Sequence, residues 1–160
     1  MVLPDVIRPG LRAVFCGTAA GAASARRDAY YAGPGNKFWR ALHVVGLTPR
    51  TLDPAEFRSL LDYGLGLTDL SKLQSGSDLE IGTTGFDVAR LAQLVRRNTP
   101  TVVAFNGKKA GRAALEEVED YGQQDVRFAG REAWVLPSTS GAANRYWDLA
   151  PWQELAGRVV

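Results

Sequence analysis

Short apolar runs alternate with helical patterns along this chain, and that alternation restricts its fold more than any other feature. Four apolar runs predict buried strands, at residues 12–16, 63–70, 101–105 and 134–136. Helix-start signals or helical spacing of apolar residues occur at residues 36–45, 53–56, 86–97, 108–121 and 147–160. Strands separated by helices pair in parallel through right-handed crossovers. The sequence therefore predicts an α/β fold, a three-layer α/β/α sandwich with a central, mainly parallel sheet.

The length of the chain suits one folding unit. A chain of 160 residues buries about two thirds of its unfolded surface, so we expect a single domain over residues 1–160. No apolar run approaches the roughly 20 residues of a membrane-spanning helix, and the first residues lack the basic and apolar segments of a signal peptide. We therefore expect a soluble, cytoplasmic monomer without a membrane partner.

The counts of cysteine and histidine exclude several kinds of chemistry. Cys16 is the only cysteine and His43 the only histidine, so the chain has no disulfide, no four-thiolate iron–sulfur cluster and no Cys/His zinc site. His43 lies inside a helical apolar pattern, which favours a structural role. We expect no metal and no cofactor. The formal charge of +2 permits an acidic partner such as DNA without requiring one.

Ligands of such sheets bind beyond the carboxyl ends of the strands. The loops after Cys16, Leu67 and Leu136 therefore matter most. A fourth turn, "FNGKKAG", places Lys108 and Lys109 at a helix start, where the helix dipole disfavours lysine. The pair is either solvated or contacts a phosphate. Residues 74–85, rich in Ser, Thr and Gly, predict a surface loop.

The loop after the first strand looks like a phosphate cradle but matches neither common pattern. G-x-G-x-x-G and G-x-x-x-x-G-K-[ST] are both absent, and the chain instead carries "GTAAG" followed by "YYAGPGNKFW". These residues resemble the first motif of the mismatch-specific uracil-DNA glycosylase and thymine-DNA glycosylase family. That motif has the form G-[IV]-N-P-G, followed by an aromatic residue and P-x-N-[KR]-F-W.

Three further blocks extend the resemblance over nearly the whole chain. "LLDYGLGLTDL" is similar to the family's LLDYxxGxT segment, "LPSTSGAANR" to its LPNPSG or LPSTSG loop, and "AFNGKKA" to its fourth turn. The resemblance implies a monofunctional DNA glycosylase of base excision repair. Such an enzyme hydrolyses the N-glycosidic bond of uracil, and of other damaged or mispaired pyrimidines as in G:U mismatches, after the base has been flipped out of DNA.

The first motif implies a pocket for the flipped base. Tyr31 occupies the position of the aromatic residue that stacks on the base, although it could instead fill the core beside Phe38 and Trp39. Backbone amides of Thr18, Ala19 and Ala20 would face the base carbonyls and stabilise the leaving anion. The residues implied to bind the base are Gly17, Thr18, Ala20, Tyr31 and Asn36.

One departure from the family concerns the attacking water. The family's first motif usually supplies an asparagine that positions this water, whereas the methyl group of Ala19 forms no hydrogen bond. Either the activity is lost or another residue supplies the polar group. Asp69, at the end of a neighbouring strand, is the best candidate. Asp87, inside a helix-start pattern, is the alternative, and Asp28 is a weaker third option.

The block "LPSTSGAANR", residues 136–145, is called the third block below and implies contacts with DNA. Ser138 and Ser140 would bind phosphate, the next four residues would fill the space left by the flipped base, and Arg145 would grip the backbone or plug the hole. Arg26, Arg27 and Lys72 would add positive charge to the same face. The residues implied to contact DNA are Lys37, Lys108, Ser138, Ser140, Gly141, Ala142, Ala143, Asn144 and Arg145. The alternatives are a lesion- or nucleotide-binding module without catalytic activity and an unrelated nucleotide-binding α/β protein.

Overall fold

The computed structural model describes residues 2–72, 75 and 85–160, and a five-stranded sheet forms its centre. The strands lie in the order β2-β1-β3-β5-β4. Pairing is parallel from β2 through β1 and β3 to β5, and β4 is antiparallel to β5. The prediction of an α/β fold with a mainly parallel sheet is therefore confirmed. The strands are β1 (Ala13–Gly17), β2 (Leu65–Asp69), β3 (Val102–Asn106), β4 (Gly122–Phe128) and β5 (Arg131–Leu136).

Helices cover both faces of the sheet. The helices are α1 (Ala22–Arg27), α2 (Phe38–Val44), α4 (Val88–Asn98), α5 (Lys108–Leu115) and α6 (Ala150–Val159), with 3₁₀ helices η1 (Pro54–Tyr63) and η2 (Gly141–Tyr146). Alternation along β3 divides the core in two: Val103 and Phe105 pack with α4 and α5, while Val102 and Ala104 pack with α2, η1 and α6. Two apolar cores on opposite faces make three layers.

Three predicted helices differ from the structure in type or by three or more residues at one end. The helix that starts at the capping box of Asp53 and Glu56 is a 3₁₀ helix. The helix predicted at 108–121 ends at Leu115, since Glu116 adopts a φ of 70°. The last helix begins three residues later than predicted, at Ala150. The loop predicted at 74–85 lies outside the described residues, apart from its positions 75 and 85.

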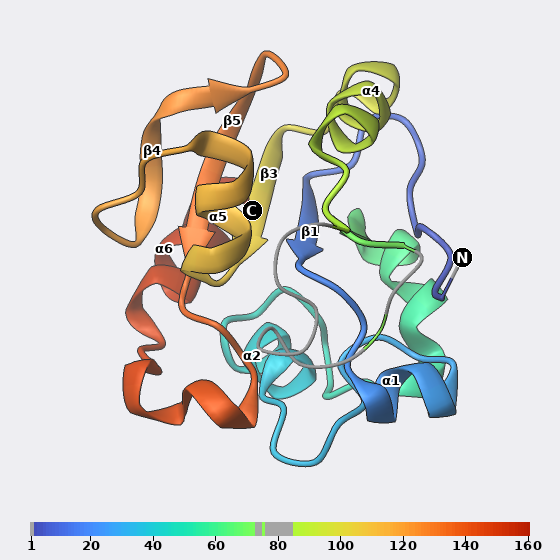
Figure 1. Cartoon of the computed structure of the whole chain (residues 1–160). Coiled ribbons are helices and arrows are strands. Elements are labelled where there is room, and N and C mark those ends of the chain that lie inside the picture. The colour runs from blue at the N-terminus through green and yellow to red at the C-terminus, as the bar shows by residue number, and fades with distance from the viewer. Residues whose placement is uncertain (1, 73–74, 76–84) are drawn as a thin grey trace.

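The carboxyl ends of the parallel strands all lie at one edge of the molecule. The arrowheads of β1 and β5 point toward this edge, where α1, α2 and η2 also lie (Figure 1). The first and third sequence blocks therefore meet beyond the strand ends, as the topology requires. No helix in the described part of the chain is long and apolar enough to cross a membrane.

Candidate active site

Gly17 and Asp69 lie side by side at the ends of β1 and β2. The strand register pairs the two residues, and the Leu70 N–H donates to the Gly17 carbonyl at 2.9 Å. A Cβ atom on Gly17 would lie only 2.8 Å from Asp69 Oδ1 and 3.1 Å from Tyr31 Oη. Any side chain at position 17 would therefore displace the carboxylate, so glycine is what lets the Asp69 carboxylate and the Tyr31 hydroxyl approach this strand end.

The carboxyl group of Asp69 is weakly acidic because it is buried. Only 3% of the residue is exposed. Burial raises the pKa of Asp69 to about 6, the positive charges of Lys72 and Arg90 lower this pKa, and the negative charge of Asp5 raises it. At neutral pH the group is mostly ionised yet basic enough to accept a proton, which is the condition for an efficient general base.

Tyr31 reaches the same point in a strained conformation. Its φ is 51°, in the left-handed region that bulky residues rarely adopt. One face of its ring stacks on Phe38, with the ring centroids 4.1 Å apart. A base could therefore stack only on the other face of the ring. Stacking of Tyr31 on a flipped base stays a prediction.

The surroundings of the Tyr31 hydroxyl oppose its ionisation. It is buried and has no partner of good hydrogen-bond geometry in the described part of the chain. Burial and the charge of Asp69 raise the pKa of Tyr31 well above its usual value, and the nearby Asn106 amide offsets this in part. The hydroxyl is therefore a neutral polar group beside the Asp69 carboxyl, with hydrogen-bonding capacity left for a ligand.

The loop that follows β1 is held against the chain after β2. The Ser71 N–H donates to the Thr18 carbonyl at 2.8 Å. Ala20 is buried and forms an isolated parallel bridge with Ser75, while Thr18 and Ala19 are half-buried. The methyl of Ala19 supplies no polar group, so the carboxyl of Asp69 is the ionisable group beside Gly17 on the neighbouring strand.

The first and third blocks are joined at Lys37. Its N–H donates to the Thr139 carbonyl at 2.9 Å, and its ammonium group donates to the Asn144 side-chain oxygen. A Cβ atom on Gly141 would lie 3.4 Å from the Pro34 carbonyl oxygen, which shows how closely the two loops pack. The side-chain oxygen of Asn36 accepts from the N–H of Phe38, the first residue of α2, at 3.0 Å.

Asn106 and Thr139, which sequence reasoning missed, anchor the third block to the sheet. The Asn106 amide donates to Thr139 Oγ1 and accepts from the Thr139 N–H, both at 3.0 Å. The two residues are buried, so the loop starts from a fixed point beyond β3 and β5. The only sequence signal was the polar Asn106 at the end of an apolar strand.

The rest of the predicted DNA-contacting loop is accessible. Ser138 and Ser140 accept from backbone N–H groups within the loop, and Ser140 caps η2. Ala142, Asn144 and Arg145 are exposed, whereas Gly141 and Ala143 are half-buried. A hollow of about 330 Å³ beside this loop is lined by Lys37, Arg40, Ala41, Val44, Trp147 and Leu149. The loop thus presents polar and cationic groups at the carboxyl edge of the sheet.

Lys108 and Lys72, whose positive charges were predicted to face DNA, contact other parts of the protein. The Lys108 ammonium donates to the Glu119 carbonyl at 2.9 Å and lies 4.7 Å from the centre of the Tyr121 ring. Lys72 was expected to add surface charge, and this is wrong because it is buried, pairing with Asp5 at 3.4 Å and donating to the Tyr30 hydroxyl. Arg26 and Arg27 are exposed on α1.

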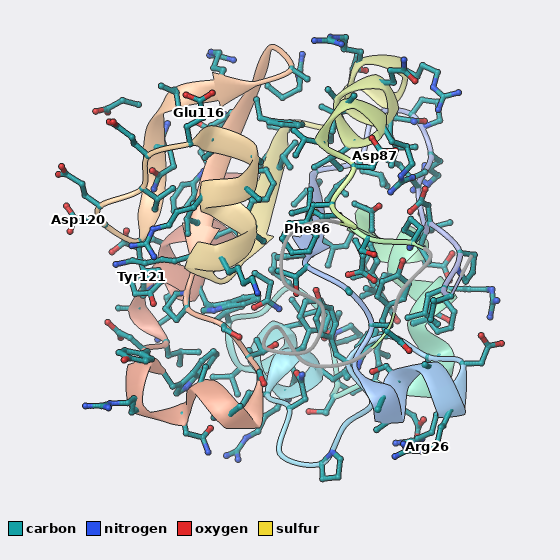
Figure 2. All side chains as sticks on the ribbon, viewed as in Figure 1. Arg26, Phe86, Asp87, Glu116, Asp120 and Tyr121 are labelled. Atoms are coloured by element: carbon teal, nitrogen blue, oxygen red, sulfur yellow. The ribbon has the colours of Figure 1, made fainter. Side chains whose placement is uncertain are left out.

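A second hollow, of about 490 Å³, lies at the connection of α5 and β4. Its walls carry the acidic residues Glu116, Glu117, Glu119, Asp120 and Asp125. Figure 2 shows Glu116, Asp120 and Tyr121 on the side of the molecule opposite Arg26. Negative charge repels DNA phosphates, so this hollow is unsuited to the substrate that the motifs imply.

The competing acidic candidates have structural positions. Asp87 is exposed and caps α4 by accepting from the Arg90 N–H at 3.0 Å. Asp28 is exposed at the end of α1, with a φ of 53°. Among the described residues no group of three His, Cys, Asp or Glu side chains could hold a metal ion.

Comparison with known proteins yields one family and a similar structure. A family model described as "Uracil DNA glycosylase superfamily" matches residues 4–156. The fold is similar to the solution NMR structure of "a putative Uracil DNA glycosylase from Methanosarcina acetivorans", with a TM-score of 0.65 and 25% sequence identity. That match covers 96% of each chain.

Proposed function

The chain belongs to the uracil DNA glycosylase superfamily, and we propose from this premise that it is a monofunctional glycosylase that hydrolyses the N-glycosidic bond of uracil in DNA. We propose uracil in G:U mismatches as its main substrate, in base excision repair. We extend the proposal to other mispaired or damaged pyrimidines. The observation that carries the proposal is the buried Asp69 carboxyl beside Gly17, at the sheet edge where the first and third motif blocks meet.

The substrate base has to leave the duplex before its sugar can be attacked, since C1′ is hidden within the stack. In our proposal the flipped pyrimidine lies over the loop after β1. The small residues Gly17, Ala19 and Ala20 allow the backbone to approach the base carbonyls, where negative charge develops as the bond breaks. Tyr31 would bound the pocket with its free face and hydroxyl.

Asp69 then serves the chemical step. As the bond between C1′ and the base nitrogen breaks, the sugar gains oxocarbenium character, which an ionised carboxylate stabilises. Asp69 accepts a proton from water while the water oxygen bonds to C1′. The base departs with the electron pair of the broken bond and takes up a proton from solvent, while Asp69 returns its proton to solvent, so the products are free uracil and an abasic site. Asp69 would thus position the attacking water, which the methyl group of Ala19 cannot do.

The DNA strand would be held by the third block. The loop is fixed at the carboxyl edge of the sheet by Lys37, which donates to Thr139 and Asn144. Arg145 is exposed in the last turn of η2, where it would contact a phosphate or fill the space left by the flipped base. A lesion-binding module without catalysis is the second candidate, because Ala19 lacks the polar group of the family motif.

An excision assay separates these two functions. Incubation with end-labelled duplexes containing G:U, A:U or G:T pairs, or with single-stranded uracil DNA, followed by alkali, reveals each abasic site as a strand break. We expect breaks at uracil, fastest in G:U, and none in a matched duplex with a G:C pair at that position. Binding measured on the same duplexes without any break would favour the lesion-binding module. Neither binding nor breaks would overturn the proposed function.

A further inference from the structure

A half-buried ion network lies close to Asp69, and its centre is Asp5 in the segment before β1. This segment is attached to β2 by hydrogen bonds in both directions between Val6 and Leu67, at 2.9 and 2.8 Å. The Asp5 carboxylate pairs with Arg90 at 2.7 Å and with Lys72 at 3.4 Å, and accepts from the Thr68 hydroxyl at 2.6 Å. Asp5 thus contacts residues on both sides of Asp69 in the sequence.

The two cations of this network have other partners than the Asp69 carboxylate. Arg90 donates to the backbone carbonyl of Asp69 at 3.0 Å and to the Thr68 hydroxyl at 3.1 Å. Lys72 donates to the Tyr30 hydroxyl at 2.8 Å. Lys72, Arg90 and Asp69 are all described, and the ion pairs among them and Asp5 all go to Asp5. Asp69 therefore lies near two positive charges without a salt bridge to either.

We propose that Asp5 is a positioning residue for Asp69: by holding Lys72 and Arg90 as its own ion-pair partners, it keeps the Asp69 carboxylate free to accept a proton from water. The proposal rests on the proposed function, because it assumes that Asp69 acts as a base. It assigns a role to a residue outside the sequence blocks of the family resemblance. Without Asp5, Lys72 would lose its ion-pair partner while its charge still acts on the Asp69 carboxylate.

The charges around Asp69 predict the direction in which its pKa changes when Asp5 or Lys72 is replaced. The groups that influence the ionisation of Asp69 are Lys72 and Arg90, which lower its pKa, and Asp5, which raises it. The Tyr30 and Tyr31 hydroxyls and the Cys16 thiol also face Asp69, but burial raises the pKa of each, so they are neutral at pH 5–8. Asp5→Asn should therefore make Asp69 more acidic, and Lys72→Met should make it less acidic.

The test is the titration midpoint of Asp69 in the 160-residue chain. It is measured by NMR of ¹³C-labelled aspartate carboxyl groups, and the Asp69 signal is assigned by its loss in Asp69→Asn. We expect Asp5→Asn to lower the midpoint by about one pH unit and Lys72→Met to raise it by a similar amount. Glu132→Gln is the matched control: both carboxylates are 14% exposed and ion-paired, but Glu132 pairs with Arg158 on another part of the fold.

The same variants are then compared in single-turnover excision as a function of pH. The acid limb of the rate should move with the NMR midpoint, to lower pH in Asp5→Asn and to higher pH in Lys72→Met. Midpoints that stay at the wild-type value, or that move in the same direction in both variants, would overturn the role of Asp5. If Asp5→Asn does not fold, the direction of the Lys72→Met shift decides. Should the wild-type protein release no uracil, the proposed function fails, and the NMR midpoints still decide whether Asp5 controls Asp69.

Discussion

Asp69→Ala is expected to excise uracil about 10²–10⁴-fold more slowly than the wild-type protein in single turnover, the usual cost of removing a general base. The variant should still bind uracil-containing DNA, because Asp69 is buried and contacts no phosphate in the proposed function. Asp69→Asn should lose less activity, since an amide orients water but cannot accept its proton. The measurement is the single-turnover rate with enzyme in excess, beside the affinity for the same duplex.

Asp87→Ala is the comparison that makes this result specific. The Asp87 carboxylate caps α4 and is exposed, so its loss should reduce stability by about 1 kcal/mol and leave the excision rate nearly unchanged. A folded Asp69→Ala protein with wild-type excision, beside a folded but inactive Asp87→Ala protein, would transfer the catalytic role to Asp87.

Asp69→Asn is expected to be more stable than the wild-type protein at pH 8 and equally stable at pH 4. Burial raises the pKa of Asp69 to about 6 in the folded chain, from 3.8 as the ordinary value. Between these values the folded state binds more protons than the unfolded state, so the free energy of unfolding falls as pH rises. Above pH 6 the ionised group costs about 2–3 kcal/mol, which a neutral amide does not incur.

Urea unfolding of both proteins at pH 4 and pH 8 measures this difference. Asp5→Asn provides a contrast of opposite sign. Although burial raises the pKa of Asp5, its hydrogen bond from Thr68 and its contacts with Arg90 and Lys72 lower the pKa overall. Ionised Asp5 therefore stabilises the fold above its unfolded pKa, and its removal should destabilise the protein at pH 8. An Asp69→Asn protein less stable than wild type at pH 8 would mean that the carboxylate serves mainly to bind backbone groups.

The sequence predicts the parallel strands because each is buried on both faces and reads as an apolar run. The edge strand β4, "GQQDVRF", is mostly exposed and lacks that run, so it was not predicted. The short helix α1 and the 3₁₀ helix η2 contain too few residues for a periodic pattern. η2 also contacts Pro34 and Lys37, which are distant from it in the sequence.

Part of the candidate site can be predicted from the sequence because its residues end predicted strands. Gly17 and Asp69 end neighbouring parallel strands, so their proximity follows from topology. The network of Asp5, Lys72 and Arg90 does not, since its members lie on three separate segments and have no common motif. Lys72 shows why: a lysine is usually exposed, and only its pairing with Asp5 and Tyr30 accounts for its burial.

The central claim is that the ionised carboxylate of Asp69 carries uracil excision, and the pH dependence of the single-turnover rate tests it most directly. With a G:U duplex we predict a rate that is constant above about pH 7, is half-maximal near pH 6, and falls about tenfold per pH unit below that point, following the pKa of Asp69. Asp69→Asn should retain a slow rate without this limb. A wild-type rate that is independent of pH between 5 and 8, or the same limb in Asp69→Asn, would contradict the account.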